Sequence, residues 1–406
     1  VPLNANGTPD STTACADAPD SEPASECFLW NAGEEMLDQV QNDIGLQYGP
    51  SPNQRRVYYS QLDATGDWPG GRRYFAPTSD AQAESSRYDL LRGFGRISTK
   101  THDGSLSEAK ESDLEEIANQ VIEDAMALKL DPNGTPGDAT DDLPFVLGDI
   151  FHSDPLLVGA PPNALYFAQD VASDGTSCDQ GNPSYRCFYR KHQKRRKVML
   201  VGSSDGLVHA FDTGIYRTSG PFDNRFDRGT GKEAFAYVPR SVLPKIKNLF
   251  ADGFDRTWLV DGSLVAGDVF IDPTTHSADR PEPEDREWRT VAISGLREGG
   301  RGYFALDVTQ PDAYDAEGNP SGINDYVPSC SDGGSDCGPL PYPAELWEFY
   351  DGLLVGSPPR FLPFDRDFNG VEDLAAGWST PSIGRILVCN GSECDPAEEN
   401  NDLEDR

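Results

Sequence analysis

The stretch VMLVGSSDGLVHAFDT, residues 198–213, decides the fold of this chain. It contains an apolar run, a Ser-Asp-Gly turn at residues 204–206, and a second, alternating run that closes on Phe-Asp. Two such runs around a short turn that contains glycine are typical of a β-hairpin. The stretch VAISGLREGGRGYFALDV, residues 291–308, has the same order of features and closes on Leu-Asp. We therefore expect two hairpins of one design.

Two further apolar runs belong to the same series, WLVDGSLVAGDVFID at residues 258–272 and ELWEFYDG at residues 345–352. Self-similar four-stranded units of about 40 to 50 residues are the signature of a β-propeller. Residues 145–392 have room for about five or six such units. We predict an all-β fold in which residues 143–406 form a β-propeller domain.

Three segments inside this domain are expected to depart from the strand pattern. The inserts at residues 173–187 and 325–341 both contain cysteine and are predicted to be loops at the rim of the propeller. Residues 241–250 are predicted to form a short helix, with Pro244 in its first turn.

Residues 1–142 are expected to form an irregular N-terminal region. Two short strands are predicted there, at residues 55–59 and 73–75. One amphipathic helix is predicted over residues 112–130, because a Ser-x-x-Glu capping box opens it and apolar residues then recur at helical spacing. The segment at residues 131–142 is acidic and rich in Gly and Pro, which indicates a linker to the propeller.

The charge of the chain excludes several kinds of partner. Its 406 residues include 68 Asp and Glu but 34 Lys and Arg, which gives a formal net charge of −34. Such a surplus opposes binding to phosphate backbones and anionic lipid, so we expect no nucleic-acid partner. No apolar stretch reaches about 18 residues, so we expect no membrane span. The first ten residues lack signal-peptide features, so either a signal was removed or the sequence is an internal piece.

The eight cysteines fall into four local pairs. These are Cys15 with Cys27, Cys178 with Cys187, Cys330 with Cys337, and Cys389 with Cys394. An even count with short spacings indicates disulfides in a secreted protein. Zinc binding is the first alternative, but it needs CxxC spacing or neighbouring histidines, and the five histidines lie outside these loops. Free thiols at some positions are the second alternative.

The sharpest chemical motif is DRDFNGVED at residues 365–373. The predicted calcium ligands are the side chains of Asp365, Asp367, Asn369 and Asp373 and the backbone carbonyl of Val371. Oxygen ligands at alternate positions followed by a glycine bend suit Ca²⁺. The twelfth position is Ala376 instead of the Glu of an EF-hand, so we expect a calcium loop between strands, at residues 374–378 and 383–388. A solvated acidic turn is the alternative.

Six segments together resemble one protein family. They are LGDIFHSDPLLVGAP (147–161), VMLVGSSDGLVHAFDTG (198–214), AFAYVPRSVLPKIKNL (234–249), WLVDGSLVAGDVFI (258–271), GGRGYFALDVTQP (299–311) and LWEF (346–349). Their order and spacing over about 250 residues resemble the C-terminal propeller of the PilY family, the type IV pilus biogenesis and tip-adhesin proteins.

The resemblance implies a modified, quinoprotein-like propeller that binds Ca²⁺ through the loop at residues 365–373. It implies a non-enzymatic, extracellular protein at the pilus tip or outer cell surface, with minor pilins and a host or surface receptor as partners. Such a protein promotes pilus assembly, adhesion and twitching motility by opposing retraction. We also expect the propeller to be incomplete at Arg406, because residues 384–395 look like the start of a hairpin. The von Willebrand-like domain of many members is not expected in this stretch.

Two other functions stay open. Propellers with similar repeats occur in pyrroloquinoline-quinone dehydrogenases, which need a catalytic carboxylate, cations on the quinone and adjacent cysteines. The chain has no adjacent cysteines. A sugar-binding or purely scaffolding propeller is the other alternative.

Two smaller motifs each have two interpretations. His209, near Asp205 and Ser203, suggests either a Ser-His-Asp site or, as we expect, a strand histidine packed between blades. The basic run RKHQKRRK at residues 190–197 is expected to be solvated and to guard the strand after it, with docking of an acidic partner as the alternative.

Overall fold

The computed structural model describes the central part of the chain most completely. The described residues are 30–41, 56–60, 72–75, 98–100, 106–108, 122, 128–130, 143–145, 147–162, 164–167, 177–178, 183–246, 249, 258–271, 286–314, 320–323, 342–350, 353–355, 360–362, 379–383, 387–389 and 403–405.

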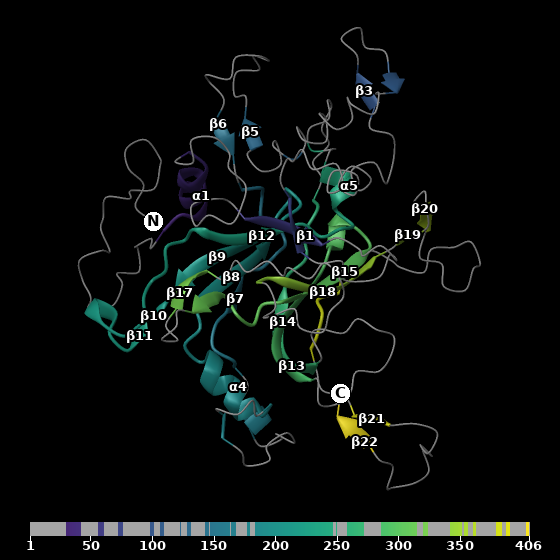
Figure 1. Ribbon diagram of the computed structural model, residues 1–406. Helices are drawn as coiled ribbons and strands as arrows, with labels where there is room; N and C mark the ends of the chain where they lie inside the picture. Colours follow the sequence, from purple (N-terminus) through teal and green to yellow (C-terminus); the bar gives the residue numbers. More distant parts are fainter. Residues whose placement is uncertain are drawn as a thin grey trace.

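Two large sheets form the centre of the molecule (Figure 1). The first consists of β1 (Val57–Ser60), β2 (Arg72–Tyr74), β7 (Leu156–Val158), β8 (Lys197–Gly202), β9 (Val208–Gly214) and β12 (Glu233–Tyr237), in the order β2-β1-β12-β9-β8-β7. The second consists of β13 (Val265–Ile271), β14 (Glu287–Gly295), β15 (Gly302–Asp307) and β18 (Ala344–Tyr350), in chain order.

Each sheet contains four consecutive antiparallel strands, as in a propeller blade. We call β7, β8, β9 and β12 blade 1, and β13, β14, β15 and β18 blade 2. The prediction of an all-β propeller is confirmed, and both hairpins quoted above form, as β8–β9 and β14–β15. The number of blades in the whole chain stays a prediction.

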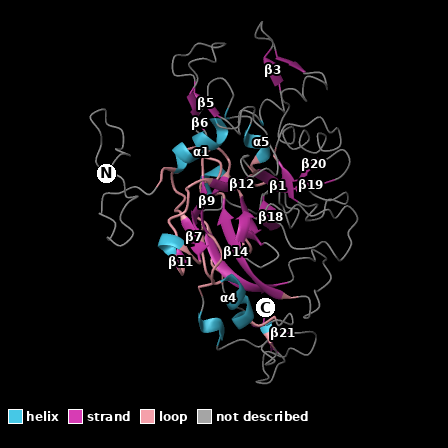
Figure 2. Ribbon diagram, turned by 60° about the vertical axis from the view of Figure 1, so that its left-hand side comes forward, coloured by secondary structure: helices cyan, strands magenta, loops and turns pink. Residues whose placement is uncertain are grey.

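Short strand pairs and helices surround the two blades. The pairs are β3 (Ser98–Lys100) with β4 (Leu106–Glu108), β5 (Leu128–Leu130) with β6 (Leu143–Phe145), β10 (Tyr216–Arg217) with β11 (Arg225–Phe226), β16 (Asp312–Tyr314) with β17 (Pro320–Ile323), β19 (Leu353–Val355) with β20 (Arg360–Leu362), and β21 (Leu387–Cys389) with β22 (Leu403–Asp405). The helices are α1 (Ala32–Gln41), α4 (Tyr185–His192) and α5 (Leu243–Ile246), with 3-10 turns η2 (Ala164–Phe167), η4 (Gly220–Phe222) and η7 (Arg297–Gly299). In Figures 1 and 2, α1 and α5 lie toward one end of the sheets and α4 toward the other.

The two blades share one register. Val198 lies opposite Asp212 in blade 1, and Val291 lies opposite Asp307 in blade 2. In each blade the pairing of the third and fourth strands shifts next to a glutamate, Glu233 in β12 or Glu345 in β18. A bulge of this kind re-aims the side chains beside it. The repeat in the sequence is therefore a repeat of backbone pairing, including its irregularity.

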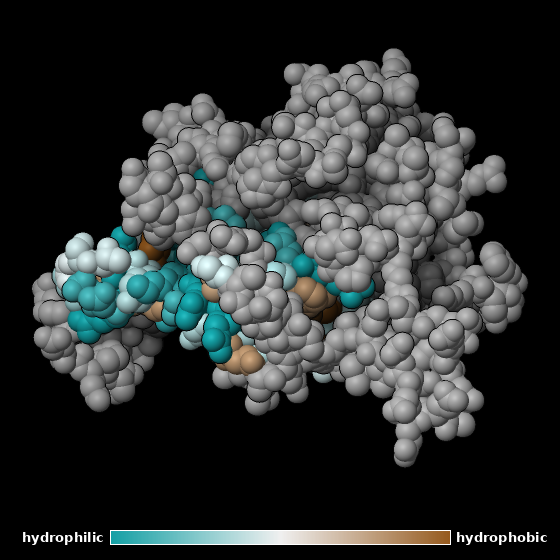
Figure 3. Space-filling view, turned by 60° about the horizontal axis from the view of Figure 1, so that its bottom comes forward, coloured by the Kyte–Doolittle hydropathy of each residue, from teal (hydrophilic) through white to brown (hydrophobic). Residues whose placement is uncertain are grey.

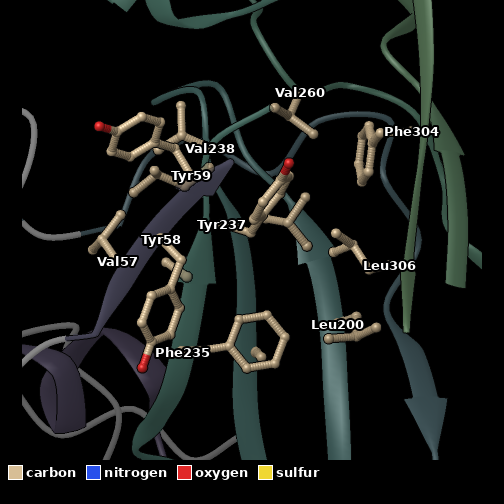
Figure 4. Packing of buried hydrophobic residues seen from close by; sticks show 14 of the residues in the cluster. Val57, Tyr58, Tyr59, Leu200, Phe235, Tyr237, Val238, Val260, Phe304 and Leu306 are labelled. Carbon is tan, nitrogen blue, oxygen red and sulfur yellow. The ribbon is translucent and has the colours of Figure 1, made fainter. Parts of the chain in front are cut away.

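A single hydrophobic cluster joins the blades. It contains buried residues from β1, β8, β9 and β12 together with Phe304, Leu306 and Val308 of blade 2 and its exit. Figure 4 shows labelled members from both sheets side by side, and the rings of Tyr237 and Phe304 have centroids 6.1 Å apart. Buried apolar area contributes about 25 cal/mol per Å², so this shared cluster is a main source of blade-to-blade stability.

The second run of the first hairpin was expected to alternate between core and solvent. Instead, six of the seven residues of β9 are buried, from Val208 to Asp212 and at Gly214. The strand lies between β8 and β12, and both of its faces are covered. A strand of this kind has no solvent-exposed face, so alternation of polar and apolar residues does not correspond to burial in it.

The helix predicted over residues 112–130 is wrong at its C-terminal end. Ile122 is helical and buried, but Leu128–Leu130 form strand β5, with Leu128 opposite Phe145 of β6. Leu128 continues the helical spacing from Ala125, whereas Leu130, two positions after Leu128, shares a face with it only in a strand, and the pairing with β6 makes the segment a strand. The remaining positions of the predicted helix lie outside the described residues.

Strand pairing crosses the boundary predicted at residue 142. β1 pairs in parallel with β12, Val57 lying opposite Ala236, and β2 continues the sheet. β1 and β2 fall close to the two strands predicted in the N-terminal region. The predicted linker at residues 131–142 connects the paired strands β5 and β6. The domain boundary itself stays a prediction.

Of the three helices given above, α5 was predicted from the sequence, whereas α1 and α4 were not. The short helix predicted at residues 241–250 contains α5. α1 lies in the region expected to be irregular and packs Met36 against Val201 and Phe211. α4 begins inside the insert predicted to be a loop, residues 173–187, because Ser184 caps it by accepting a hydrogen bond from the Cys187 backbone N–H.

Candidate functional site

The predicted calcium ligands Asp365, Asp367, Asn369, Val371 and Asp373 lie outside the described residues. Within the parts of the chain that are described, no group of three or more His, Cys, Asp or Glu side chains is arranged to hold a metal ion. The strand predicted at residues 374–378 is also outside them. Of the strand predicted at residues 383–388, Leu387 and Val388 belong to β21, whereas Ile383 is in no strand.

Blade 1 contains a buried charged centre around His209. The ring Nδ1 is 2.7 Å from Glu233 Oε1, and Nε2 is 3.0 Å from Asp205 Oδ2. All three side chains are at most 1% exposed. Backbone N–H groups of Gly148 and Leu207 donate to the two oxygens of Asp205 and fix its position.

His209 carries a proton at neutral pH. Burial alone would lower its pKa, but the charges of Asp205 and Glu233 and their hydrogen bonds raise the pKa to about 9. Both ring nitrogens are therefore occupied donors, and the hydroxyl of Ser203 makes no hydrogen bond to the ring. A histidine in this state cannot act as a general base for a serine. The packed strand histidine is confirmed, and the Ser-His-Asp interpretation is wrong.

The basic run at residues 190–197 is not solvated throughout, contrary to expectation. Arg195 is 1% exposed and Arg196 is 6% exposed. The Arg196 guanidinium lies 3.1 Å from Asp212 Oδ1 and 3.0 Å from Asp312 Oδ1. Acidic partners for this run thus exist within the chain, and they neutralise the charge that burial would otherwise penalise.

Arg195 connects the two blades. Its Nη1 donates to Thr290 Oγ1 at 2.8 Å and to the Thr309 carbonyl at 3.0 Å, both in or next to blade 2. Its Nε donates to the Gly159 carbonyl, just after β7 of blade 1. A planar guanidinium with several fixed donors suits such a junction.

The start of α4 is fixed by a disulfide and by a buried phenol. The predicted pair Cys178–Cys187 is disulfide-bonded, and the other three predicted pairs include residues outside the described part of the chain. Tyr185 donates its hydroxyl to Asp268 Oδ2 at 2.7 Å, and Thr290 donates to Asp268 Oδ1. The helix is therefore attached directly to blade 2.

Blade 2 buries two acidic side chains against β12 of blade 1 and the segment just after β12. Glu348 accepts hydrogen bonds from the N–H groups of Arg240 and Ser241 and from the Ser241 hydroxyl. Burial raises the pKa of Glu348, and these hydrogen bonds oppose the rise. Glu345 accepts a hydrogen bond from the Tyr237 hydroxyl. The charged interior of the described region thus joins blades, and these groups are engaged with protein partners.

Sequence reasoning missed these interior residues. His209 and Asp205 were singled out, but Glu233, Glu345 and Asp312 were not. One signal was available, since EAFAY in β12 and ELWEF in β18 both place a glutamate two positions before an aromatic residue.

The exterior of the described region is mostly hydrophilic on the face shown in Figure 3, with a few hydrophobic patches. The large apolar side chains that are exposed are Ile150, Phe151, Leu157 and Trp347. Among the described residues, no helix combines the length and the hydrophobicity needed to cross a bilayer.

Comparison with known proteins gives one consistent result. Residues 147–324 match the family model described as the PilY1 beta-propeller domain. A Type IV pilus biogenesis factor PilY1 homolog of Xylella fastidiosa is 34% identical over 166 residues, which cover 41% of this chain and 11% of the relative. The Type IV pilus biogenesis factor PilY1 of Pseudomonas aeruginosa strain PAO1 is 33% identical over 169 residues, with the same coverage.

Among solved structures, the crystal structure of the Pseudomonas aeruginosa PilY1 C-terminal domain is 30% identical. The match covers 38% of this chain and 23% of that one, with a TM-score of 0.23. The matched segment of this chain corresponds to about a tenth of the length of the curated relatives. Residues 147–324 contain the four strands of blade 1 and three of the four strands of blade 2, and β18 lies beyond them. Residues 147–324 are therefore similar in sequence to the PilY1 beta-propeller domain.

Proposed function

We propose that the chain is a non-enzymatic component of the type IV pilus, located outside the cell at the pilus tip. It would promote pilus assembly, adhesion and twitching motility by opposing retraction, with minor pilins as its direct partners. The match of residues 147–324 to the PilY1 propeller domain supports this proposal, together with relatives named type IV pilus biogenesis factors.

Deletion of the gene in its native host tests the pilus role. We expect fewer surface pili and smaller twitching zones, with recovery when the wild-type gene is restored. Recovery should fail for a gene that lacks blade 2, because that blade shares its core with blade 1. Normal piliation in the deletion strain would contradict the proposal.

The absence of enzymatic activity is supported by the interior chemistry. The best base candidate, His209, is protonated and fully enclosed, and Arg195 and Arg196 are bound to protein acceptors. Addition of pyrroloquinoline quinone should therefore produce neither a bound-quinone absorbance nor dye reduction with alcohols. Either signal would favour the dehydrogenase alternative instead.

We also propose that Asp365, Asp367, Asn369, Asp373 and the carbonyl of Val371 bind Ca²⁺. At a concentration of calcium 100 times its Kd, the ion should stabilise the fold by about 2.7 kcal/mol. A thermal melt with and without calcium measures this.

The Asp367→Ala variant should lose the calcium-dependent shift. Asp223→Ala, which removes an exposed aspartate from the loop between β10 and β11, is the control and should keep it. Equal shifts in wild type and Asp367→Ala would show that this loop is not the site.

A further inference from the structure

We propose that the surface around Phe151 binds a neutral pyranose sugar, with the apolar face of the sugar ring stacked on the Phe151 side chain. This binding site shares no residue with the predicted calcium loop or with the buried networks described above. It goes beyond the proposed pilus function and can be tested on the purified chain.

Three aromatic rings form the centre of this site, which we call the aromatic platform: Phe151, His152 and Trp258. The Phe151 ring stacks on Trp258 with centroids 5.6 Å apart and 28° between planes. It meets His152 edge-on, with centroids 4.2 Å apart. Phe151 nevertheless remains 58% exposed. A large ring supported from below and open above presents a π-face to which the C–H groups of a sugar ring can pack.

Polar groups lie next to the platform. His152 Nδ1 lies 2.6 Å from Asp261 Oδ2, which fixes the ring and makes Nδ1 the donor. Its Nε2 has no protein partner among the described residues, and 29% of the side chain is exposed. Nε2 is thus available for a hydrogen bond with a hydroxyl group of a ligand.

Two charged groups complete the rim. The exposed carboxylate of Asp154 lies 3.3 Å from the Ser263 hydroxyl, and Ser263 also contacts the His152 carbonyl. Arg297, with a side chain 29% exposed, approaches the buried Asp261 carboxylate at 3.9 Å. Charged groups make stronger hydrogen bonds to hydroxyls than neutral groups do.

The backbone segments that carry the platform are closely packed. A Cβ at Gly262 would lie 1.9 Å from the Gly295 carbonyl oxygen, and one at Gly299 would lie 1.8 Å from that of Leu259. The loops that carry Trp258 and Arg297 therefore contact each other backbone to backbone. Arg297 itself has a φ of +53°, a left-handed conformation that costs about 1–3 kcal/mol in a non-glycine residue. A preorganised binding site loses less conformational entropy when a ligand binds.

The size of the apolar surface favours a sugar over a protein partner. A stable protein interface buries about 800 Å² per partner with an apolar centre. Among the described residues near the platform, Ile150 and Phe151 are the large exposed apolar ones, and Asp149 and Asp154 flank them in the chain. One aromatic face with a polar rim matches a single sugar ring. The net charge of −34 favours a neutral sugar over an anionic one.

The test uses the full chain on an array of neutral and anionic glycans. It is followed by NMR titration with the methyl glycosides of glucose, galactose, mannose and N-acetylglucosamine. We expect binding of at least one neutral sugar. Phe151→Ala should weaken it at least about tenfold, whereas Phe151→Tyr should stay within about threefold.

Leu157→Ala is the matched control, because Leu157 is 57% exposed, almost the same as Phe151, but lies on β7. It should bind sugar as the wild type does. Phe151 is exposed, so Phe151→Ala should also melt within about 1 °C of the wild type.

Three results would overturn the proposal. The first is no sugar binding on the array or by NMR. The second is equal sugar affinity for wild type and Phe151→Ala. The third is Phe151-dependent binding of pyrroloquinoline quinone or of minor pilins without any sugar binding, which would assign the platform to that ligand.

Discussion

The two blades have the same register but different interiors. The pairing of Val198 with Asp212 and of Val291 with Asp307 makes His209 of blade 1 equivalent to Phe304 of blade 2. His209 is a buried cation between two carboxylates, whereas Phe304 is part of the shared hydrophobic cluster. The same backbone arrangement therefore accommodates a buried charge in blade 1 and an apolar ring in blade 2. The strand ends and the bulge are the features that the two blades share.

The two blades have the same side-chain interactions at the end of their third strands, β9 and β15. Asp212 accepts a hydrogen bond from the N–H two residues later, and so does Asp307. Each of these carboxylates faces an arginine, Arg196 at 3.1 Å or Arg289 at 3.5 Å. The arginine also has the same place in both blades. It stands two residues before the valine that lies opposite the aspartate, Val198 in blade 1 and Val291 in blade 2. An Arg–Asp pair at the end of the third strand is thus common to both blades.

Conversion of the blade 1 centre to that of blade 2 should have the largest effect. His209→Phe removes the cation and leaves Asp205 and Glu233 buried on either side of an uncharged ring. We expect a loss of about 3–5 kcal/mol in the free energy of unfolding, measured by urea denaturation. Replacement of both carboxylates as well, with Asp205→Asn and Glu233→Gln, should recover part of the loss. No recovery in the triple variant would show that shape, and not charge, decides this position.

The Arg–Asp pairs should differ in strength although they are equivalent in position. Arg196→Met leaves Asp212 and the fully buried Asp312 without a cation, and we expect a loss of about 3–4 kcal/mol. Arg289→Met should cost about 1 kcal/mol, because its pair is longer and its side chain is 13% exposed. Urea midpoints of the two variants measure the difference. Equal losses would mean that the Asp312 contact contributes little.

The charged centre should also make stability depend on pH. The pKa of His209 is raised to about 9 in the folded chain, compared with 6.5 when unfolded, so folding favours the protonated ring. The resulting stabilisation is complete below about pH 6.5 and is lost as pH rises through 9. It amounts to about 3 kcal/mol at 1.36 kcal/mol per pKa unit.

Urea titrations at pH 6.5, 8 and 9.5 measure this dependence. The triple variant without the cation and both carboxylates should show a flatter profile than the wild type. Parallel profiles would place the titration elsewhere in the chain.

The smallest expected effect tests α4, which lies in the connection between the first two strands of blade 1. Ser184→Ala removes the hydroxyl that accepts from the Cys187 N–H, and should cost about 1 kcal/mol. Ser219→Ala is the matched control, because Ser219 precedes η4 without making a side-chain cap. Its thermal melt should equal that of the wild type. An equal loss in both variants would argue against capping as the cause.

The parts of the fold that depend on residues close together in the sequence could be predicted. The hairpins β8–β9 and β14–β15 follow from apolar runs around a glycine turn, and the pair Cys178–Cys187 follows from its short spacing. The sequence places strand β5 at the end of a helix because Leu128 continues the helical spacing of the apolar residues before it, and that spacing does not reveal the pairing with β6.

The buried charges could not be predicted, since their partners are distant in the chain. Arg196 reads as a surface residue in a basic run until Asp312, 116 positions later, is placed beside it. His152 and Asp261 are 109 positions apart, so the fixed orientation of that ring was equally hidden. The calcium ligands at residues 365–373 remain a prediction from local spacing alone.

The parallel pairing of β1 with β12 has a consequence for biosynthesis. During synthesis, roughly 180 further residues must leave the ribosome before Ala236 can pair with Val57. Strand pairings between residues so far apart in the chain form slowly. During that interval β1 lacks its partner β12, and an unpaired strand edge can pair with another chain. We therefore expect that assistance from a chaperone limits the yield of this protein more than the strength of its finished core does.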